Sequence, residues 1–221
     1  AVAVGVPRMD KYFKKSKNIE DPFKIVLFGF DPKQKAFRYV SDNTKEEVFI
    51  EIGELFQINI IRYCIRNREY HLNIKLKSSK DFDYFSKIIS KYGIQNLPSN
   101  IAIISEDSTY DLIQNSRYIA SFTSTTLLEA FASDKILICP DYSNIAKLNQ
   151  IDFFSDIPNV INYVTNEESI KNIINKNMRD NIIKENEKSR ILKPLLHKID
   201  GSASSAVERE IILSIKASKN L

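Results

Sequence analysis

The fold of this chain depends on one stretch, Tyr118-Ile119-Ala120-Ser121-Phe122-Thr123-Ser124-Thr125-Thr126-Leu127-Leu128-Glu129-Ala130-Phe131. Its first part is apolar and predicts a buried strand. Its last part places Leu127, Leu128 and Phe131 on one face of a helix. The hydroxyl-rich residues between them fall where the strand ends and the helix begins. The stretch therefore predicts a strand, a tight turn and a helix in succession.

The start of that helix has two interpretations. A helix N-terminus presents unpaired backbone N–H groups and a positive dipole end, which suit a phosphate or a substrate hydroxyl. Alternatively, Ser124 or Thr125 simply caps the helix. The stretch taken alone favours the cap, because caps outnumber anion sites.

The surrounding sequence predicts further strands separated by helices. We expect helices at about 45–67, 82–92 and 109–116, and strands at 23–30, 70–77, 101–104, 118–122, 135–139 and 160–164. Gly29-Phe30-Asp31-Pro32 is predicted as a loop that continues neither neighbouring element. The residues after 166 are helical in pattern, with breaks at Pro194 and Gly201. Alternating strands and helices indicate an α/β fold with a doubly wound parallel sheet and C-terminal helices.

The two ends of the chain suggest its organisation. Residues 1–22 are expected to form an interdomain hinge or linker, and residues 23–221 one domain. The first residues, Ala1-Val2-Ala3-Val4-Gly5-Val6, have no initiator Met and resemble the middle of a strand. We therefore expect the chain to be a piece of a longer protein.

Composition excludes several function classes. The 221 residues are 43% hydrophobic, enough for a sizeable core, and the formal charge of +4 comes from 32 basic and 28 acidic residues spread along the chain. Without a basic block, nucleic acid is not an expected partner. Cys64 and Cys139 lie in apolar settings, and the two histidines form no cluster with them, so no zinc site is expected. A phosphate-bearing ligand, or weak attraction to an anionic membrane, fits the charge.

Ligands of open parallel sheets bind beyond the carboxyl ends of the strands. That rule selects the loops after the predicted strands, and we expect a nucleotide mono- or diphosphate to bind there. The candidate binding residues are Gly29, Lys75, Lys77, Glu106, Ser124, Thr125, Thr126 and Glu129. The alternatives are a solvated strand-end charge for each lysine and a plain surface carboxylate for Glu129, whose proposed role is binding a ribose diol.

A family resemblance supports this interpretation. Residues 124–138 (STTLLEAFASDKILI) resemble the pattern S-T/S-x-x-x-E-A-hydrophobic-x-x-x-K-hydrophobic of the donor-binding half of GT-B glycosyltransferases, especially those that build bacterial capsule, lipopolysaccharide and teichoic acid. Residues 111–116 (DLIQNS) are similar to the helix that precedes it. Residues 5–10 (GVPRMD) resemble the G-x-P-R-x-D hinge of glycerophosphotransferase and surface-carbohydrate groups. Residues 200–207 resemble a D-G-x-A-S-x-R-V ending, with Ala206 in place of Arg.

The resemblance implies a Rossmann-like domain, the C-terminal half of a GT-B fold. The sequence differs from glycerophosphotransferases at two places. It has Lys75-Leu76-Lys77-Ser78 where they have K-x-H-P, and Phe122-Thr123-Ser124-Thr125 where they have D-Y-S-S. These departures favour a sugar transferase. The implied donor is a nucleotide-activated sugar of the CMP, CDP, UDP or GDP type, and no metal or other cofactor is expected.

The predicted function is donor binding in a glycosyltransferase of bacterial surface polysaccharide biosynthesis, with a polysaccharide or lipid-linked acceptor. The fragment is expected to be inactive without an N-terminal domain, which commonly supplies the catalytic base. Two alternatives stay open: a non-catalytic nucleotide- or partner-binding module, and an enzyme of the sugar-nucleotide epimerase type. The expected location is cytoplasmic, with peripheral contact at the inner face of the cell membrane left open.

Overall fold

A computed structural model describes residues 2–14, 20–40, 43–122, 124–145, 154, 159–177 and 185–218. The chain divides into two compact units. The larger unit comprises Asn18–Phe131 and Lys135–Asn181, and the smaller comprises Ala1–Lys17, Ala132–Asp134 and Ile182–Leu221. In the described residues no helix is long and apolar enough to cross a membrane.

The larger unit is built on a parallel sheet. Its described strands form a six-stranded sheet in the order β3-β2-β1-β4-β5-β6, with every pair parallel. The strands are β1 Asp21–Phe28, β2 His71–Lys75, β3 Ile101–Ile104, β4 Ser116–Ser121, β5 Ile136–Pro140 and β6 Ile161–Val164. This topology confirms the predicted α/β doubly wound, Rossmann-like sheet. The order reverses between β1 and β4, which is the switch point of the sheet.

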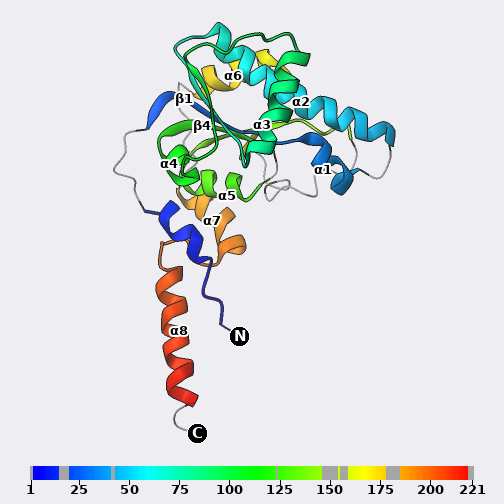
Figure 1. Ribbon diagram of the computed structural model, residues 1–221. Helices are drawn as coiled ribbons and strands as arrows, with labels where there is room; N and C mark the ends of the chain where they lie inside the picture. Colours follow the sequence, from blue (N-terminus) through cyan, green and yellow to red (C-terminus); the bar gives the residue numbers. More distant parts are fainter. Residues whose placement is uncertain are drawn as a thin grey trace. The chain divides into compact units, whose positions relative to one another are not determined.

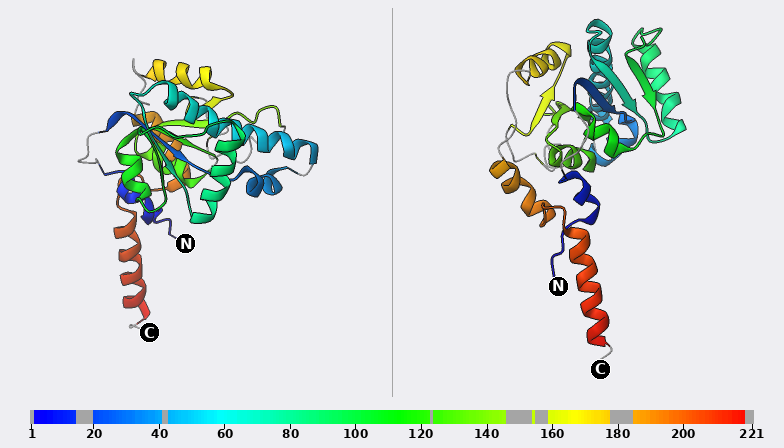
Figure 2. Two further views of the ribbon diagram at one scale, coloured as in Figure 1. Left: turned by 45° about the horizontal axis from the view of Figure 1, so that its top comes forward. Right: turned by 90° about the vertical axis from the view of Figure 1, so that its left-hand side faces the viewer.

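The central strands are covered on both faces, as their continuous apolar sequences predict. In β1, Ile25, Val26 and Leu27 expose at most 1% of their surface, and Ile119 and Ala120 of β4 expose none. The larger unit contains helices α1 Pro32–Tyr39, α2 Asn43–Arg66, α3 Ser79–Lys91, α4 Thr109–Gln114, α5 Thr125–Ala132 and α6 Glu167–Asn177. Helices α2 and α6 cover one face of the sheet, and α4 and α5 the other (Figures 1 and 2).

Helix α1 corrects the sequence prediction, which placed a loop at Gly29-Phe30-Asp31-Pro32 and no helix after it. Asp31 is the N-cap: its side chain accepts a hydrogen bond of 2.9 Å from the backbone N–H of Lys33. Pro32 is the first helical residue, where its missing N–H costs nothing. The Asp-Pro pair therefore ends the loop and begins a helix.

Gly53, within α2, is explained by close packing. A Cβ at this position would lie 2.7 Å from the Pro32 ring and 2.8 Å from the Tyr142 hydroxyl oxygen. The glycine therefore lets α2 approach both α1 and the loop after β5.

The smaller unit joins the two ends of the chain. It contains a short 3-10 helix, η1 Pro7–Tyr12, and helices α7 Glu185–Leu196 and α8 Ala203–Ser218. The Asp10 carboxylate accepts hydrogen bonds from the backbone N–H groups of Ala203 (3.0 Å) and Ser204 (2.8 Å), at the start of α8. Burial raises the pKa of Asp10, but the hydrogen bonds from Ser204 and Ala203 outweigh it, so this pKa lies below 3.8.

Two expectations about the C-terminal helices have different outcomes. The break at Gly201 is present, and a Cβ there would lie 3.1 Å from the Asp10 carbonyl oxygen. The break at Pro194 is wrong, because α7 continues through Pro194 to Leu196. The proline lies in the last turn, and the helix ends at Leu196, just before His197, whose φ of 64° is left-handed.

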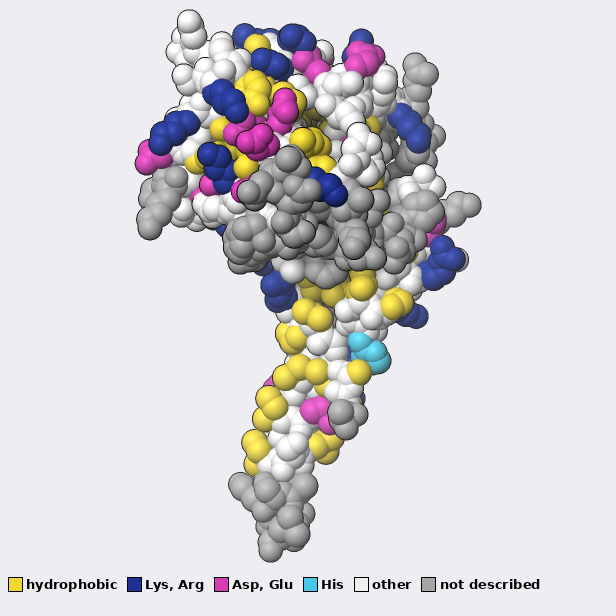
Figure 3. All heavy atoms as spheres, turned by 90° about the vertical axis from the view of Figure 1, so that its right-hand side faces the viewer, with side chains coloured by type: hydrophobic (Ala, Val, Ile, Leu, Met, Phe, Trp, Pro, Cys, Tyr) yellow, Lys and Arg dark blue, Asp and Glu magenta, His cyan; other side chains and the backbone are white. Residues whose placement is uncertain are grey.

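Most of α8 is exposed. Ala203 and Ala206 are buried at its start, whereas Ile211, Ile212, Leu213 and Ile215 each keep between 45% and 54% of their surface exposed. Figure 3 shows apolar side chains along this helix.

Candidate functional site

A cavity of about 490 Å³ lies at the carboxyl edge of the sheet. Loops after β1, β2 and β4 form it, together with residues of α1, α4 and α5. Its described lining consists of Phe28, Gly29, Phe30, Lys35, Lys75, Leu76, Lys77, Thr109, Ser121, Phe122, Ser124 and Thr126. Because β1 and β4 both contribute, the cavity lies at the switch point, where open α/β sheets bind their ligands.

The loop after β1 is held tightly against β2. The backbone N–H of Gly29 donates a 2.9 Å hydrogen bond to the Lys75 carbonyl oxygen. A Cβ on Gly29 would lie 2.7 Å from Cδ2 of Leu76, a side chain that is 1% exposed. This close approach of Leu76 explains a glycine at the cavity wall without reference to any ligand.

Three lysines from different elements line the cavity. Lys75 ends β2, Lys77 follows two residues later, and Lys35 comes from α1. The ammonium group of Lys75 donates a hydrogen bond to the Ser105 carbonyl oxygen. No acidic side chain is among the described lining residues. The cavity therefore has an excess of positive charge, which favours an anionic ligand.

Ser124 caps the start of α5, as one of the two interpretations of the sequence expected. The Ser124 hydroxyl oxygen accepts a 3.1 Å hydrogen bond from the backbone N–H of Thr126 and lies 3.0 Å from the Thr126 hydroxyl. Both side chains also line the cavity. One hydroxyl thus caps the helix while the same end of α5 faces the cavity. Thr123 lies outside the described residues.

The structure brings five of the eight candidate residues together at the cavity: Gly29, Lys75, Lys77, Ser124 and Thr126. The other three are not in the described lining. Thr125 is the exposed first residue of α5, and Glu106 is exposed in the loop after β3. Glu129 lies further along α5 and is 9% exposed.

Sequence reasoning missed Lys35, Thr109 and Ser121 as lining residues. Lys35 was missed because α1 was missed, and the signal that could have found it is the Asp31-Pro32 helix start. The hydroxyl of Ser121 donates a 2.9 Å hydrogen bond to the Phe122 carbonyl oxygen. The sequence indicated only that Ser121 ends a buried strand. Its place in the lining was missed because only the tertiary structure brings the end of β4 to the cavity.

Aromatic rings support one wall of the cavity. The Phe30 and Phe122 rings stack with centroids 5.1 Å apart and an interplanar angle of 27°. Phe122 meets Tyr142 edge to face at 5.5 Å, and Tyr142 stacks on Phe49 at 4.5 Å. Burial raises the pKa of the Tyr142 phenol, whose hydroxyl has no hydrogen-bond partner in the described part of the chain. These rings join the loops after β1, β4 and β5.

The chain contains one Asp-x-Asp sequence, Asp81-Phe82-Asp83, in α3. The Asp81 carboxylate accepts hydrogen bonds from the backbone N–H (2.9 Å) and hydroxyl (3.1 Å) of Ser78. Asp81 therefore belongs to a helix capping box. Among the described residues, no group of three or more His, Cys, Asp or Glu could hold a metal ion.

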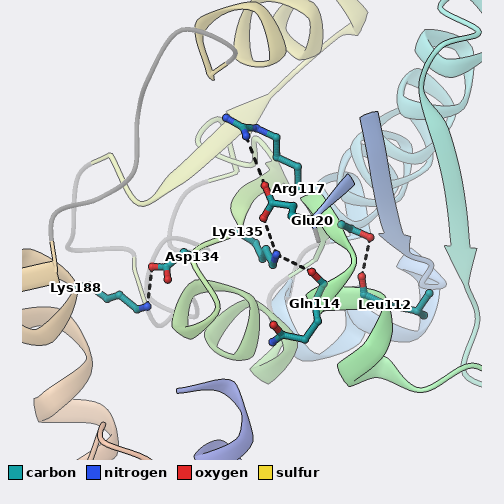
Figure 4. Close-up of polar contacts among 8 residues, drawn as sticks. Glu20, Leu112, Gln114, Arg117, Asp134, Lys135 and Lys188 are labelled. Carbon is teal, nitrogen blue, oxygen red and sulfur yellow. Dashed lines mark hydrogen bonds and ion pairs between the residues drawn. The ribbon is translucent and has the colours of Figure 1, made fainter. Parts of the chain in front are cut away.

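The amino edge of the sheet carries a different set of charges (Figure 4). Lys135, the lysine of the glycosyltransferase-like pattern, is 8% exposed. Its ammonium group lies 2.7 Å from a Glu20 carboxylate oxygen and donates a 3.0 Å hydrogen bond to the Gln114 carbonyl oxygen. The other Glu20 oxygen lies 3.5 Å from Arg117. Lys135 thus stabilises the fold just before β5, at the edge opposite the cavity.

This chain matches no known protein family, and it matches no curated protein. Among solved structures it is similar to a chain of the GtfA/B complex, with 13% identity and a TM-score of 0.44 over 90% of this chain and 38% of that one. It is similar to Methanocaldococcus jannaschii UDP-GlcNAc 2-epimerase in complex with UDP-GlcNAc and UDP (12% identity, TM-score 0.48, 88% of this chain and 54% of that one). A third similar structure is a mutant of S. aureus TarM in complex with fondaparinux, alpha-GlcNAc-glycerol and UDP (15% identity, TM-score 0.41, 91% of this chain and 37% of that one). The chain thus spans between 37% and 54% of the length of these proteins.

Proposed function

We propose that the larger unit binds the phosphate groups of a nucleotide-activated sugar, and that the chain is the donor-binding half of a GT-B glycosyltransferase. The observation that carries the proposal is the cavity of about 490 Å³ at the β1–β4 switch point, lined by Lys35, Lys75 and Lys77 and by the start of α5. The ordered sequence motifs that resemble such enzymes support the same function. We extend the proposal to the synthesis of a bacterial surface polysaccharide because those motifs resemble capsule, lipopolysaccharide and teichoic acid transferases.

Each part of the cavity has a role in this proposal. The lysines neutralise the phosphate charge, and the backbone N–H groups at the start of α5 donate hydrogen bonds to phosphate oxygens. Thr109 offers a further hydroxyl donor. The same groups would stabilise the charge that develops on a departing nucleotide. The described lining contains no histidine, cysteine or carboxylate, so the catalytic base is expected from another domain.

Thermal unfolding with CMP, CDP, UDP and GDP tests the proposal. A nucleotide that binds the native state raises Tm by mass action, and about a hundredfold excess over Kd adds about 2.7 kcal/mol. We expect one of the four to raise Tm clearly. The absence of any shift with all four at millimolar concentration would refute binding by this chain.

Two variants locate the binding. Lys75→Ala and Ser124→Ala should each lose most of the nucleotide-induced shift while keeping cooperative unfolding. Lys87→Ala is the matched control, because Lys87 is an exposed lysine of α3 outside the described lining. If the Lys75 and Ser124 variants respond to nucleotide as fully as the control, binding lies elsewhere.

A further inference from the structure

One buried side chain holds the loop after β1 by both of its polar ends. Gln57 of α2 is fully buried, and its amide nitrogen donates hydrogen bonds to the carbonyl oxygens of Phe30 (3.0 Å) and Gly53 (3.2 Å). Its amide oxygen accepts a 3.1 Å hydrogen bond from the Phe30 backbone N–H. A side chain thus takes the place of a neighbouring strand at Phe30, two residues beyond the end of β1.

Phe30 connects this clamp to the cavity. Phe30 and Phe122 both line the cavity, and their rings stack at 5.1 Å. Phe30 follows β1 and Phe122 follows β4, so the stacked pair spans the switch point. The position of the Phe30 backbone therefore places one ring of this stack at the cavity wall.

The chemistry of the clamp requires an amide. Phe30 presents one donor and one acceptor, and a buried backbone group without a partner is costly. A glutamine satisfies both because its amide carries a donor and an acceptor. An ionised glutamate has no donor and would face the Phe30 carbonyl oxygen with negative charge. A methionine of similar volume would leave both Phe30 groups unpaired.

We propose that Gln57 is a positioning residue for nucleotide binding: it holds the Phe30 backbone, and through the Phe30–Phe122 stack it presets the wall of the cavity. The inference rests on the proposed function. It adds a residue that touches no ligand, and it places the control of affinity in α2, behind the loops that line the cavity.

Gln57→Met is the first test. The probe is whichever of CMP, CDP, UDP and GDP gives the wild-type chain its largest thermal shift, and Kd is measured by calorimetry on the folded fraction. We expect Kd to rise about tenfold or more with unfolding still cooperative, because a loosened wall must be reordered on binding. An unchanged Kd in the folded variant overturns the inference.

Gln57→Glu supplies a second test if the methionine variant does not fold. Burial raises the pKa of a glutamate, so this side chain should be protonated at about pH 5 and ionised at about pH 8. Protonated, it offers Phe30 a donor and an acceptor again. We therefore expect the ratio of Kd at the higher pH to Kd at the lower pH to exceed the wild-type ratio by about tenfold. A ratio equal to that of the wild type overturns the inference.

Gln114→Glu is the matched control for placing a carboxylate at a buried glutamine. Gln114 is 6% exposed, ends α4, and is not in the described lining. Its variant should change stability without changing the Kd ratio. If none of the four nucleotides changes the Tm of the wild-type chain, the proposed function and this inference are both refuted. Wild-type binding with unaffected Gln57 variants would refute only the role of Gln57.

Discussion

The two edges of the parallel sheet use lysine in opposite ways. At the amino edge, the buried Lys135 ammonium is bound by Glu20 at 2.7 Å and by the Gln114 carbonyl oxygen at 3.0 Å. At the carboxyl edge, Lys35, Lys75 and Lys77 line one cavity without an acidic side chain in the described lining. The first arrangement pairs its lysine with a carboxylate inside the protein, whereas the second places its lysines at the wall of a cavity that an anionic ligand can enter.

This difference shows how to interpret a lysine in a family-like pattern. Lys135 belongs to the pattern that resembles glycosyltransferases, yet its partners make it part of the fold. Asp10, in the smaller unit, is similar: both of its carboxylate oxygens accept backbone hydrogen bonds at the start of α8. Contacts within the protein, and not membership of a motif, therefore identify Lys135 and Asp10 as structural charges.

The largest expected effect is at the amino edge. Lys135→Met should lower the free energy of unfolding by about 3 kcal/mol, because it leaves the Glu20 carboxylate and the Gln114 carbonyl oxygen without their shared donor. Urea unfolding measures the loss. Nucleotide affinity of the folded fraction should stay at the wild-type value, and a clear loss of affinity would break the distinction between the two edges.

Asp10→Asn should cost about 2 kcal/mol at neutral pH, because one charge-assisted hydrogen bond to the start of α8 is lost and the other is weakened. The folded pKa of Asp10 lies below 3.8. Its contribution is therefore present above the unfolded pKa and disappears as pH falls through the folded pKa. Unfolding of both proteins across this acid range should show their stabilities converging. A constant difference in stability would contradict this account.

Lys77→Met should raise the Kd of the bound nucleotide about tenfold, because one phosphate contact is removed. The side chain is exposed, so the free energy of unfolding should change by less than about 0.5 kcal/mol. Calorimetry and urea unfolding measure the two quantities. Lys135→Met should lower stability and leave Kd unchanged, whereas Lys77→Met should raise Kd and leave stability unchanged. A loss of stability without a rise in Kd would show that Lys77 has a structural role.

The smallest of the four main effects is expected at the start of α5. Ser124→Ala should cost about 1 kcal/mol, because the Thr126 N–H loses its cap. Ser124→Asp can restore the cap, but it brings negative charge to the cavity. We expect thermal unfolding to show near-wild-type stability for the aspartate variant without nucleotide, and isothermal titration to show weaker binding. Equal nucleotide affinity in both variants and the wild type would leave Ser124 with a capping role alone.

Much of the fold was predictable because strands and helices here have strong local patterns. The strand at 101–104 is at its predicted position, and the central strands are buried as their apolar runs indicated. Helix α1 was missed for two reasons. It has only eight residues, too few for a clear apolar period, and Pro32 was interpreted as a residue that ends the preceding element and begins no helix. The predicted break at Pro194 was wrong for a related reason: a proline in the last turn does not interrupt the rest of the helix.

The candidate site was predictable only in part. The rule that ligands bind at the carboxyl ends of strands selected Gly29, Lys75, Lys77, Ser124 and Thr126, which the structure brings to one cavity. It could not select Lys35, which depends on α1, or Gln57, whose partner Phe30 is 27 residues away in the chain. Nor could it show that Lys135 is bound by Glu20, 115 residues earlier.

The sequence by itself therefore determined the alternation of elements, the burial of the central strands and the capped start of α5, because these depend on propensities and periods within short segments. The tertiary structure alone decided which strand-end loops share a cavity, which lysines find a carboxylate, and that the two ends of the chain meet at Asp10 and α8. These outcomes depend on strand order and on contacts between distant residues, which no local pattern encodes. The stretch from Tyr118 to Phe131 shows both levels: its strand and helix were set locally, and its place beside β1 at the switch point was set by the sheet.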